Sequence, residues 1–244
     1  MDEDDDNLDQ LLRSLGLHRI REILRPELDR ATAQGSSHRE LLGRLFRAQN
    51  TYRKERSFLY RLEQARLPEK WSLETFPFAQ QPGVNATQIR QLGELDFLAD
   101  FRNLVFIGPT GVGKTGLGCG IVLKALEAGH RCLFVKAQDL FDEMYASLAD
   151  KSTRHLMNRL RSVDLLMIDE MGYLNLKPEQ TNIFFKLMDE RYNRKSTIVT
   201  TNLEYDDWFG FLGKKEMVGA LLDRLRHHCH TIQINGSSLR QPAT

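Results

Sequence analysis

Eight consecutive residues of this 244-residue chain have the side chains and the spacing needed to hold a phosphate. They match the pattern G-x-x-x-x-G-K-[ST], in which glycines let the backbone wrap around an anion and turn successive N–H groups toward it. A short apolar run, residues 104–107, precedes the pattern and a helical stretch follows it, as the pattern requires. We predict that these residues bind nucleotide phosphates: Gly108, Pro109, Thr110, Gly111, Val112, Gly113, Lys114 and Thr115.

The last two residues of the motif carry its chemistry. We expect Lys114 to reach the β- and γ-phosphates of ATP, where its charge would assist catalysis. The Thr115 hydroxyl is expected to bind Mg²⁺, an ion that bridges the β- and γ-oxygens and neutralises charge that develops during transfer. The motif therefore predicts ATP and Mg²⁺ as cofactors.

Two adjacent acids follow a second apolar run, residues 165–168. The carboxyl ends of parallel strands converge on a ligand crevice, so Asp169 and Glu170 are expected to face the phosphates. Asp169 would hold Mg²⁺, directly or through water, and Glu170 would polarise the attacking water. The presence of both acids predicts hydrolysis as well as nucleotide binding.

Two further residues are candidates for catalysis. Asn202 ends the next apolar run, and although an asparagine there is commonly a turn residue, its order after the two motifs favours a place beside the γ-phosphate. Arg224 lies on a predicted helix with apolar neighbours. It is either a surface arginine paired with Asp223 or another acid, or an arginine finger that a neighbouring subunit donates to stabilise transition-state charge.

These residues need a sheet to position them. Short apolar runs alternate with helical stretches, which indicates a parallel sheet covered on both faces. The expected fold class is α/β, a P-loop NTPase sandwiched by helices. Glycines at 116, 118 and 120 in the helix after the P-loop are poor helix formers and are expected to allow close packing against the sheet. The expected strands are 104–107, 132–135, 165–168, 197–200 and 231–234, and the expected later helices are 137–162, 178–192 and 217–227.

The first part of the chain has a different texture. From residue 8 to about residue 66 apolar residues recur at helical spacing, which predicts about three helices, with Pro26 early in the second or at its boundary. The stretch from there to residues 82–83 is interpreted as a linker. We therefore predict two domains, a small N-terminal all-helical domain over 1–66 and an ATPase domain over 67–244.

Taken together, the motifs resemble those of AAA+ ATPases, and among them the IstB-type transposition helpers and the related DnaC-type helicase loaders. The resemblance extends from the N-terminal helices to near the C-terminus. It implies a helper that uses ATP to form a homo-oligomer on double-stranded DNA, with ATP sites at subunit interfaces, remodels the DNA and recruits or activates a cognate transposase. It also favours Arg224 as the arginine finger. The matching segments are 108–115, 127–129, 164–174 and 222–225, with Asn202 and Trp208.

The chain departs from the family pattern at its end. Where the family commonly has Gly-x-Ser-Tyr-Arg, this chain has Gly236, Ser237, Ser238, Leu239 and Arg240, so the tyrosine is missing and the role of Arg240 is open. Thr201 stands where a serine is common. The chain has no room after the last strand for a helical lid, and a sensor arginine from such a lid is not expected.

Two basic stretches could contact DNA. The first lies on the third N-terminal helix, interleaved with aromatic side chains, and the second lies just before the acidic strand. Both could also be ordinary solvated helix faces. Neither contains a base-reading motif, so binding through them would be electrostatic and weakened by salt. The candidate residues are Arg53, Lys54, Arg56 and Arg61 in the first stretch, and Lys151, Arg154, Arg159 and Arg161 in the second.

Composition excludes other classes of protein. The net charge of +1 hides an acidic start, residues 2–9, which is expected to be a disordered tail, and a basic remainder. Three cysteines without paired spacing suit a reducing compartment, and no apolar run approaches the ~20 residues that cross a bilayer, so a cytoplasmic protein without a membrane role is expected. Residues 227–230, His-His-Cys-His, are contiguous and are interpreted as a helix end that runs into a strand, not as a metal site.

Three alternatives to the transposition helper remain open. A DnaC-like loader of a replicative helicase would share the ATPase residues but act on single-stranded DNA. A P-loop kinase for a small metabolite would need an acceptor pocket and an arginine-rich lid, and the sequence has neither. A nucleotide-gated binding module without turnover is disfavoured by Glu170.

Overall fold

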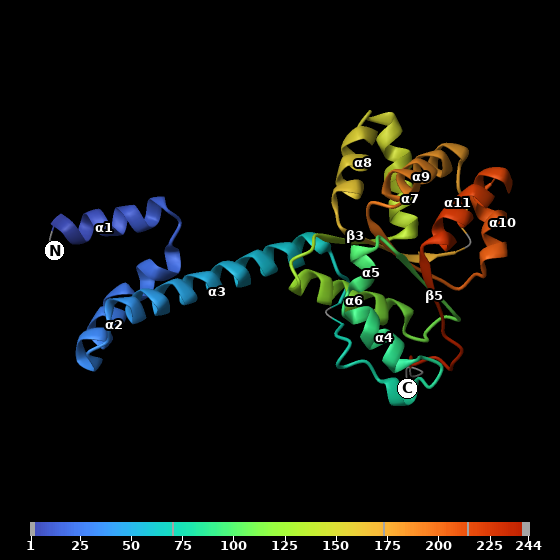
Figure 1. The fold of residues 1–244 in the computed structure, drawn as a ribbon. Coiled ribbons are helices and arrows are strands. Elements are labelled where there is room, and N and C mark those ends of the chain that lie inside the picture. Colours follow the sequence, from blue (N-terminus) through green and yellow to red (C-terminus); the bar gives the residue numbers. More distant parts are fainter. Residues whose placement is uncertain (1–2, 70, 173, 214, 241–244) are drawn as a thin grey trace. The chain divides into compact units, whose positions relative to one another are not determined.

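The computed structural model describes residues 3–69, 71–172, 174–213 and 215–240 (Figure 1). The chain divides into two compact units, Met1–Tyr60 and Arg61–Thr244. The first unit is helical, and the second contains the sheet and both phosphate-binding motifs.

Three helices account for the first unit, as the apolar spacing predicted: α1 (Glu3–Ser14), α2 (His18–Gln34) and α3 (His38–Ala65), the last of which ends inside the second unit. Their small core joins Leu12, Ile20 and Leu45. Two expectations were wrong here. The acidic start is helical from Glu3 onward instead of a disordered tail, and Pro26 lies in the middle of α2 instead of near its start.

A five-stranded parallel sheet forms the centre of the second unit, which confirms the predicted fold class. Its spatial order is β2-β3-β4-β1-β5, and every neighbouring pair is parallel. The P-loop strand β1 and the acidic strand β3 are therefore separated by β4. The strands are β1 (Asn103–Ile107), β2 (Cys132–Lys136), β3 (Leu165–Met171), β4 (Ser196–Thr201) and β5 (Cys229–Gln233).

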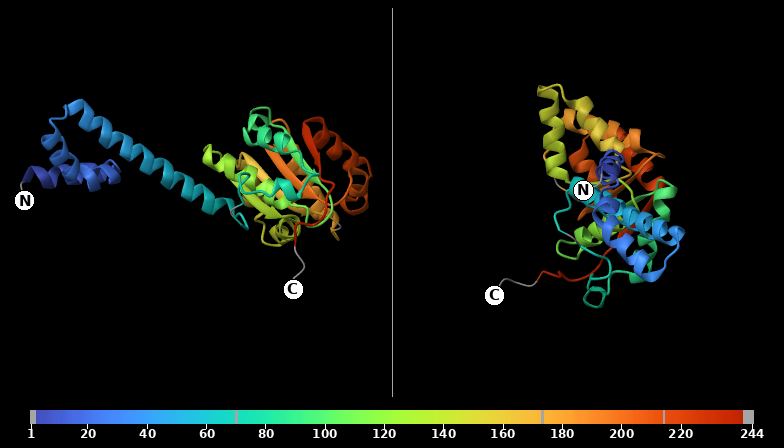
Figure 2. Two further views of the ribbon diagram at one scale, coloured as in Figure 1. Left: turned by 90° about the horizontal axis from the view of Figure 1, so that it is seen from below. Right: turned by 90° about the vertical axis from the view of Figure 1, so that its left-hand side faces the viewer.

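Helices cover both faces of this sheet (Figure 2). On one face, alternate strand residues such as Val105 and Ile168 join an apolar cluster with α7 (Ala137–Ala149), α8 (Thr153–Ser162), α9 (Pro178–Arg191) and α11 (Lys215–His227). Helix α6 (Lys114–Glu127) lies on the other face, where Gly118 faces Met167 and Ile198. The remaining helices of the unit are α4 (Ala86–Gly93), α5 (Asp96–Ala99), α10 (Phe209–Leu212) and two 3₁₀ turns, η1 (Phe78–Gln80) and η2 (Tyr205–Trp208).

The stretch before α4 is packed against α6 and is not a linker, contrary to the sequence interpretation. We call residues 71–76 the strap. Leu73 and Phe76 of the strap are buried, and Leu73 lies against Gly120 of α6 while Trp71 lies against Gly116. The glycines of α6 therefore allow close approach on two sides: Gly118 to the sheet, as predicted, and the other two to the strap.

One helix predicted over 137–162 is two helices, α7 and α8, with a break between them. At the break the Asp150 carboxylate accepts a hydrogen bond from the N–H of Ser152, and Lys151 has a left-handed backbone with φ of 60°. Such a local side-chain bond competes with the helical ladder. At the other end of the unit, α11 ends at His227, as predicted, and β5 begins at Cys229, two residues before the predicted start. In the described ranges no helix combines the length and the apolarity that a membrane span requires.

Candidate nucleotide site

The sheet order brings three motifs to one edge of the sheet. The P-loop follows β1, β4 ends with Thr200 and Thr201, and Asp169 lies near the end of β3. Because β4 lies between the other two strands, the hydroxyl of Thr200 reaches the same Asp169 carboxylate that Thr115 of the P-loop contacts. These residues line one cavity of about 700 Å³, a size suited to a nucleotide.

The phosphate-binding loop has the backbone that its glycines predict. Gly111 and Gly113 have left-handed φ values of 86° and 96°, which side chains with a Cβ rarely adopt. There is no space for a side chain either: a Cβ on Gly111 would lie 2.1 Å from Ser238 Oγ, and one on Gly113 would lie 2.7 Å from the ring of Phe76. The strap and the C-terminal segment, residues 236–240, therefore pack directly against the phosphate-binding loop.

Lys114 is held within the loop that it is predicted to serve. Its Nζ donates to the carbonyl oxygens of Gly108 and Pro109, each at 2.7 Å. Burial lowers the pKa of Lys114, the nearby Asp169 charge raises it, and the charge of Arg240 lowers it further. A bound phosphate would offset this burial effect, since an anion in the loop favours the charged ammonium.

Thr115 and Asp169 lie together, as the Mg²⁺ prediction requires. The hydroxyl of Thr115 donates to the Asp169 carboxylate, at 2.9 Å to Oδ1 and 3.1 Å to Oδ2. Asp169 is only 2 % exposed, and desolvation raises the pKa of its carboxyl against the lowering effect of hydrogen bonds from Thr200 and Thr115. A hydroxyl and a carboxylate on one side of a phosphate loop are hard oxygen donors that fit Mg²⁺.

Thr200 connects the two acids. Its hydroxyl donates to Asp169 Oδ1 and accepts the backbone N–H of Glu170 at 3.0 Å. Glu170 lies at an irregularity in the β3–β4 register and has a left-handed φ of 59°, which is strained for a non-glycine residue. The strain turns its side chain out of the alternation of the strand, so that Asp169 is buried while Glu170 is exposed and lines the cavity.

Lys136 pairs with the Glu170 carboxylate, and Asn202 lines the same cavity. Lys136, at the end of β2, lies with its Nζ 3.6 Å from Glu170 Oε2, and both side chains are exposed. Asn202 lines the same cavity just beyond β4, with its Oδ1 beside Gly172. Asn202 therefore lines the cavity that the P-loop and both acids also line, and its place beside the γ-phosphate stays a prediction. Tyr173, in the segment that carries the family resemblance, lies outside the described residues.

Sequence reasoning missed part of the cavity wall. Residues distant from the motifs complete it: Trp71, Phe76 and Gln80 from the stretch before α4, Lys136 from β2, and Leu239 and Arg240 from the C-terminal segment. That segment is fixed to the loop, because the N–H of Leu239 donates to the carbonyl of Gly111 at 2.8 Å. The family pattern at the C-terminus was the only signal in the sequence for this contribution.

Arg224 is not among the residues that line this cavity. It lies on α11, exposed, with its Nε 3.3 Å from Asp189 Oδ1 and its Nη1 donating to the carbonyl of Ala220. Its acid partner is thus Asp189 of α9 and not its chain neighbour Asp223. Arg224 is therefore an exposed, ion-paired arginine outside the lining of the cavity.

The arginine side chains of the two basic stretches make different contacts within the chain. In the first, Arg53, Lys54 and Arg56 are exposed on α3, and Arg56 donates to the Tyr52 hydroxyl at 3.3 Å. Arg61 instead donates to the carbonyl of Leu126 at the end of α6.

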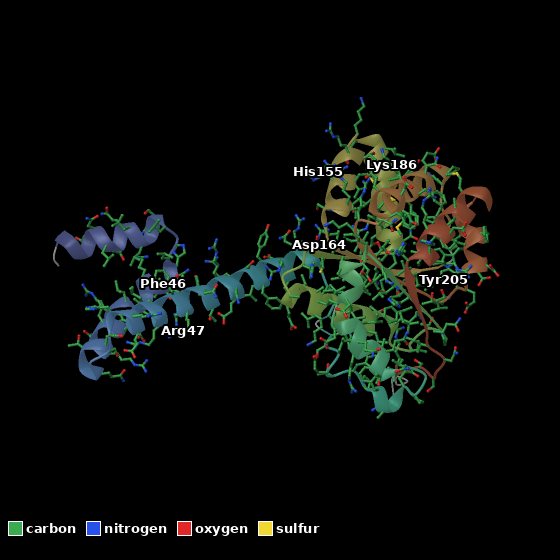
Figure 3. All side chains as sticks on the ribbon, in the orientation of Figure 1. Phe46, Arg47, His155, Asp164, Lys186 and Tyr205 are labelled. Carbon is green, nitrogen blue, oxygen red and sulfur yellow. The ribbon has the colours of Figure 1, made fainter. Side chains whose placement is uncertain are left out.

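The second stretch covers α8, whose exposed side His155 marks in Figure 3. Here Arg159 pairs with Glu143 at 2.6 Å and Arg161 with Glu190 at 3.8 Å. Lys151 and Arg154 are exposed. Three of the eight predicted residues, Arg61, Arg159 and Arg161, therefore contact other groups of the chain. This leaves fewer cations to contact DNA phosphates than the sequence suggested.

Solved structures similar to this chain share the fold of its second unit. A crystal structure of DnaI matches with a TM-score of 0.59 and 22% identity over 68% of this chain and 92% of that one. The DnaC helicase loader matches with a TM-score of 0.53 and 22% identity over 62% of this chain and 88% of that one. AMPPCP-bound DnaA from Aquifex aeolicus has a TM-score of 0.59 and 22% identity over 70% and 51% of the two chains. At this identity the likeness establishes the AAA+ P-loop fold alone.

Curated relatives are closer in sequence. The putative ATP-binding protein of insertion sequence IS21 from Pseudomonas aeruginosa is 34% identical over 96% of this chain and 88% of its own length. The corresponding protein of IS5376 from Geobacillus stearothermophilus is 31% identical over 86% and 84% of the two chains. The model of the IstB-like ATP binding protein family matches residues 10–243. This chain therefore belongs to the IstB-like ATP-binding proteins of IS21-type insertion sequences.

Proposed function

We propose that the protein hydrolyses ATP with Mg²⁺ and acts as a DNA-binding helper of its insertion sequence's transposase. The observation that carries the proposal is the contact of Thr115 with Asp169 beside the outward-turned Glu170. Mg²⁺ would supply charge neutralisation at the phosphate oxygens, held by Thr115 and Asp169. Lys114 then binds the phosphates, and Glu170 takes a proton from the attacking water, which Asn202 helps to orient.

We further propose that Arg224 acts in trans and that the active form is a homo-oligomer. The support is that Arg224 is exposed and does not line its own chain's cavity. An arginine donated across a subunit interface raises hydrolysis rates by about 10³–10⁵ and makes catalysis depend on assembly. Each ATP site would then lie at an interface between subunits.

The proposed partners are double-stranded DNA and the cognate transposase. The IS21 and IS5376 relatives are insertion-sequence proteins, and we infer the same setting for this chain. The N-terminal helical domain, residues 1–66, is proposed to bind DNA or the transposase, with Arg53, Lys54 and Arg56 as its exposed cations. Lys151 and Arg154 of the ATPase domain, residues 67–244, are the second proposed phosphate contacts.

A steady-state ATPase assay tests the proposal. The rate per subunit is measured without DNA, with duplex DNA and with single-stranded DNA, over a range of protein concentrations and at two salt concentrations. We expect stimulation by duplex DNA that increases with protein concentration and weakens as salt rises. Glu170→Gln should bind ATP and lose hydrolysis by a factor of about 10²–10⁴.

The other outcomes of the assay discriminate among alternatives. Preference for single-stranded DNA would favour a helicase-loader-like function. A rate that ignores DNA altogether would contradict the DNA-binding part of the proposal, and full activity in Glu170→Gln would contradict the assigned base.

A further inference from the structure

The Arg224 guanidinium is held on two of its sides by its own chain. Its Nε lies 3.3 Å from Asp189 Oδ1, and its Nη1 donates to the Ala220 carbonyl at 3.1 Å. Asp189 belongs to α9 and Ala220 to α11, two helices that pack against each other. The two contacts therefore join the side chain to a fixed part of the ATPase unit.

A guanidinium has five N–H donors in one plane. Nη1 donates to the Ala220 carbonyl and Nε lies at ion-pair distance from Asp189, while the side chain stays 45% exposed. These two contacts restrict the orientation of the group, and its exposure leaves it accessible to another molecule. An arginine held in this way can bind phosphate oxygens in the bidentate geometry of its planar group.

We propose that Asp189 is a positioning residue that orients Arg224 for the ATP site of a neighbouring subunit. This inference rests on the trans-acting Arg224 of the proposed function. Without Asp189, the long arginine side chain would sample many rotamers before it met the phosphate, and this ordering cost would fall on the transition state. The carboxylate itself touches neither ATP nor the attacking water.

An acid beside an arginine can also have the opposite effect on hydrolysis. A carboxylate that mainly neutralised the guanidinium would compete with the phosphate, and its removal would speed hydrolysis. The single contact through Nε, with the Asp189 side chain 65% exposed, favours orientation over neutralisation, because solvent screens an exposed pair. The sign of the change in rate therefore separates the two roles.

A mixing experiment measures this sign with full-length protein. Lys114→Ala lacks a working site but keeps Arg224, and Arg224→Ala keeps the site but lacks the finger. Each alone should be inactive, and a mixture should recover ATP hydrolysis. When Asp189→Asn is added to the Lys114→Ala donor, the recovered kcat should fall about threefold to fivefold, with the KM for ATP unchanged.

Two variants of the donor control for folding and charge. Glu179→Gln removes one exposed carboxylate from the same helix and should leave the recovered rate unchanged. Asp189→Glu keeps a carboxylate and should restore most of the recovered rate that Asp189→Asn loses. Thermal unfolding of each donor should match the parent, because both acids are exposed.

The outcomes separate this inference from the function on which it rests. No recovery in the first mixture would overturn the trans arrangement and the role of Asp189 with it. Recovery that Asp189→Asn leaves unchanged, or raises, would overturn the positioning role alone.

Discussion

Thr115 and Asp169 are 54 positions apart in the sequence, yet the Thr115 hydroxyl lies 2.9 Å from the Asp169 carboxylate. Two independent strands must end at the same edge of the sheet for this contact to form. The Thr115 hydroxyl and the hydroxyl of Thr200 both donate to this buried carboxylate. Burial of the Asp169 charge nevertheless has an energetic cost, because desolvation raises the pKa of its carboxyl.

Asp169→Asn is expected to stabilise the nucleotide-free protein while it abolishes Mg²⁺-dependent hydrolysis. Burial raises the pKa of Asp169 above its ordinary value of 3.8, so the folded protein binds this proton more tightly than the unfolded chain does. The contribution of this proton to the free energy of unfolding is therefore favourable below about pH 3.8, and it is lost as the pH rises through the higher pKa of the folded state. At pH 7 the charged carboxylate costs stability, which the amide would relieve.

Urea denaturation at pH 7 and near pH 4 checks this expectation. The variant should have the higher midpoint at pH 7, and the gain should shrink toward pH 4 as the wild-type carboxyl becomes protonated. A lower midpoint at pH 7 would show that the hydrogen bonds from Thr115 and Thr200 outweigh the burial of the charge.

Thr200→Val should reduce both stability and turnover. Thr200 is 1% exposed, and its hydroxyl satisfies the Glu170 N–H and Asp169 Oδ1 together, so an isosteric methyl leaves both of these groups without this partner. We expect a loss of about 1–3 kcal/mol in the free energy of unfolding. The kcat should fall about tenfold, because the turned backbone of Glu170 loses its support.

Thr200→Ser is the matched control, since it keeps the hydroxyl and removes only a methyl group. Denaturation and kcat should both remain near wild type. Equal damage from the valine and serine variants would mean that packing, and not the hydrogen bonds, makes Thr200 necessary.

The sequence predicted most of this site because its residues follow a fixed order on strands that end together. Lys114, Thr115 and Asp169 could be assigned to one site from their motifs, and Asn202 from its order after them, since parallel strands direct their carboxyl ends to one edge. The strand bounds differ from the predicted ones by no more than three residues, because continuous apolar runs are strong signals for buried strands.

The sequence could not predict contacts between residues that are distant in the chain, because no local pattern indicates them. Residues 67–83 carry prolines, a glycine and polar residues, which are typical of a linker. Leu73 and Phe76 are nevertheless buried, because Gly120 of α6 lies against Leu73 and Gly113 of the P-loop lies against Phe76. The partner of Arg224 was likewise open, because a helix periodicity shows which side chains share a face but not which neighbouring helix lies opposite. Both gaps concern tertiary packing.

Gly120→Ala should destabilise the protein by displacing the strap. A Cβ on Gly120 would lie 2.6 Å from Leu73 Cδ2 and 3.2 Å from the Leu73 backbone nitrogen, so the strap would have to move. Overpacking of this kind costs about 1–3 kcal/mol, against a helix-propensity gain of at most about 1 kcal/mol. Gly219→Ala, on α11 with nothing within 4 Å of the new Cβ, should instead raise stability by about 0.5–1 kcal/mol.

Both variants are compared by urea denaturation. Nucleotide affinity should fall in Gly120→Ala alone, since Trp71 and Phe76 of the strap line the cavity. If Gly120→Ala gained stability as Gly219→Ala does, the strap would not be packed on α6.

Arg191→Met should cause the largest loss of stability among these variants. Arg191 is 1% exposed and donates to the carbonyls of Leu160 at 2.8 Å, Val163 at 3.1 Å and Ser196, joining the end of α8 to the start of β4. Burial lowers the pKa of its guanidinium to about 10, which still leaves it charged at neutral pH. A methionine would fill the space but leave three carbonyl groups without this donor, at a cost of about 3 kcal/mol or more.

Arg194→Met is the control, because Arg194 is exposed three residues later and should change stability by less than about 0.5 kcal/mol. The free energy of unfolding from urea denaturation, supported by the thermal midpoint, measures both. Replacing both partners of a buried ion pair by hydrophobic residues can leave the stability unchanged. Here only the arginine is replaced and the carbonyl acceptors remain buried, so a loss of stability is expected. A small loss in Arg191→Met would mean that water reaches the three carbonyls and that this side chain does not join α8 to the sheet.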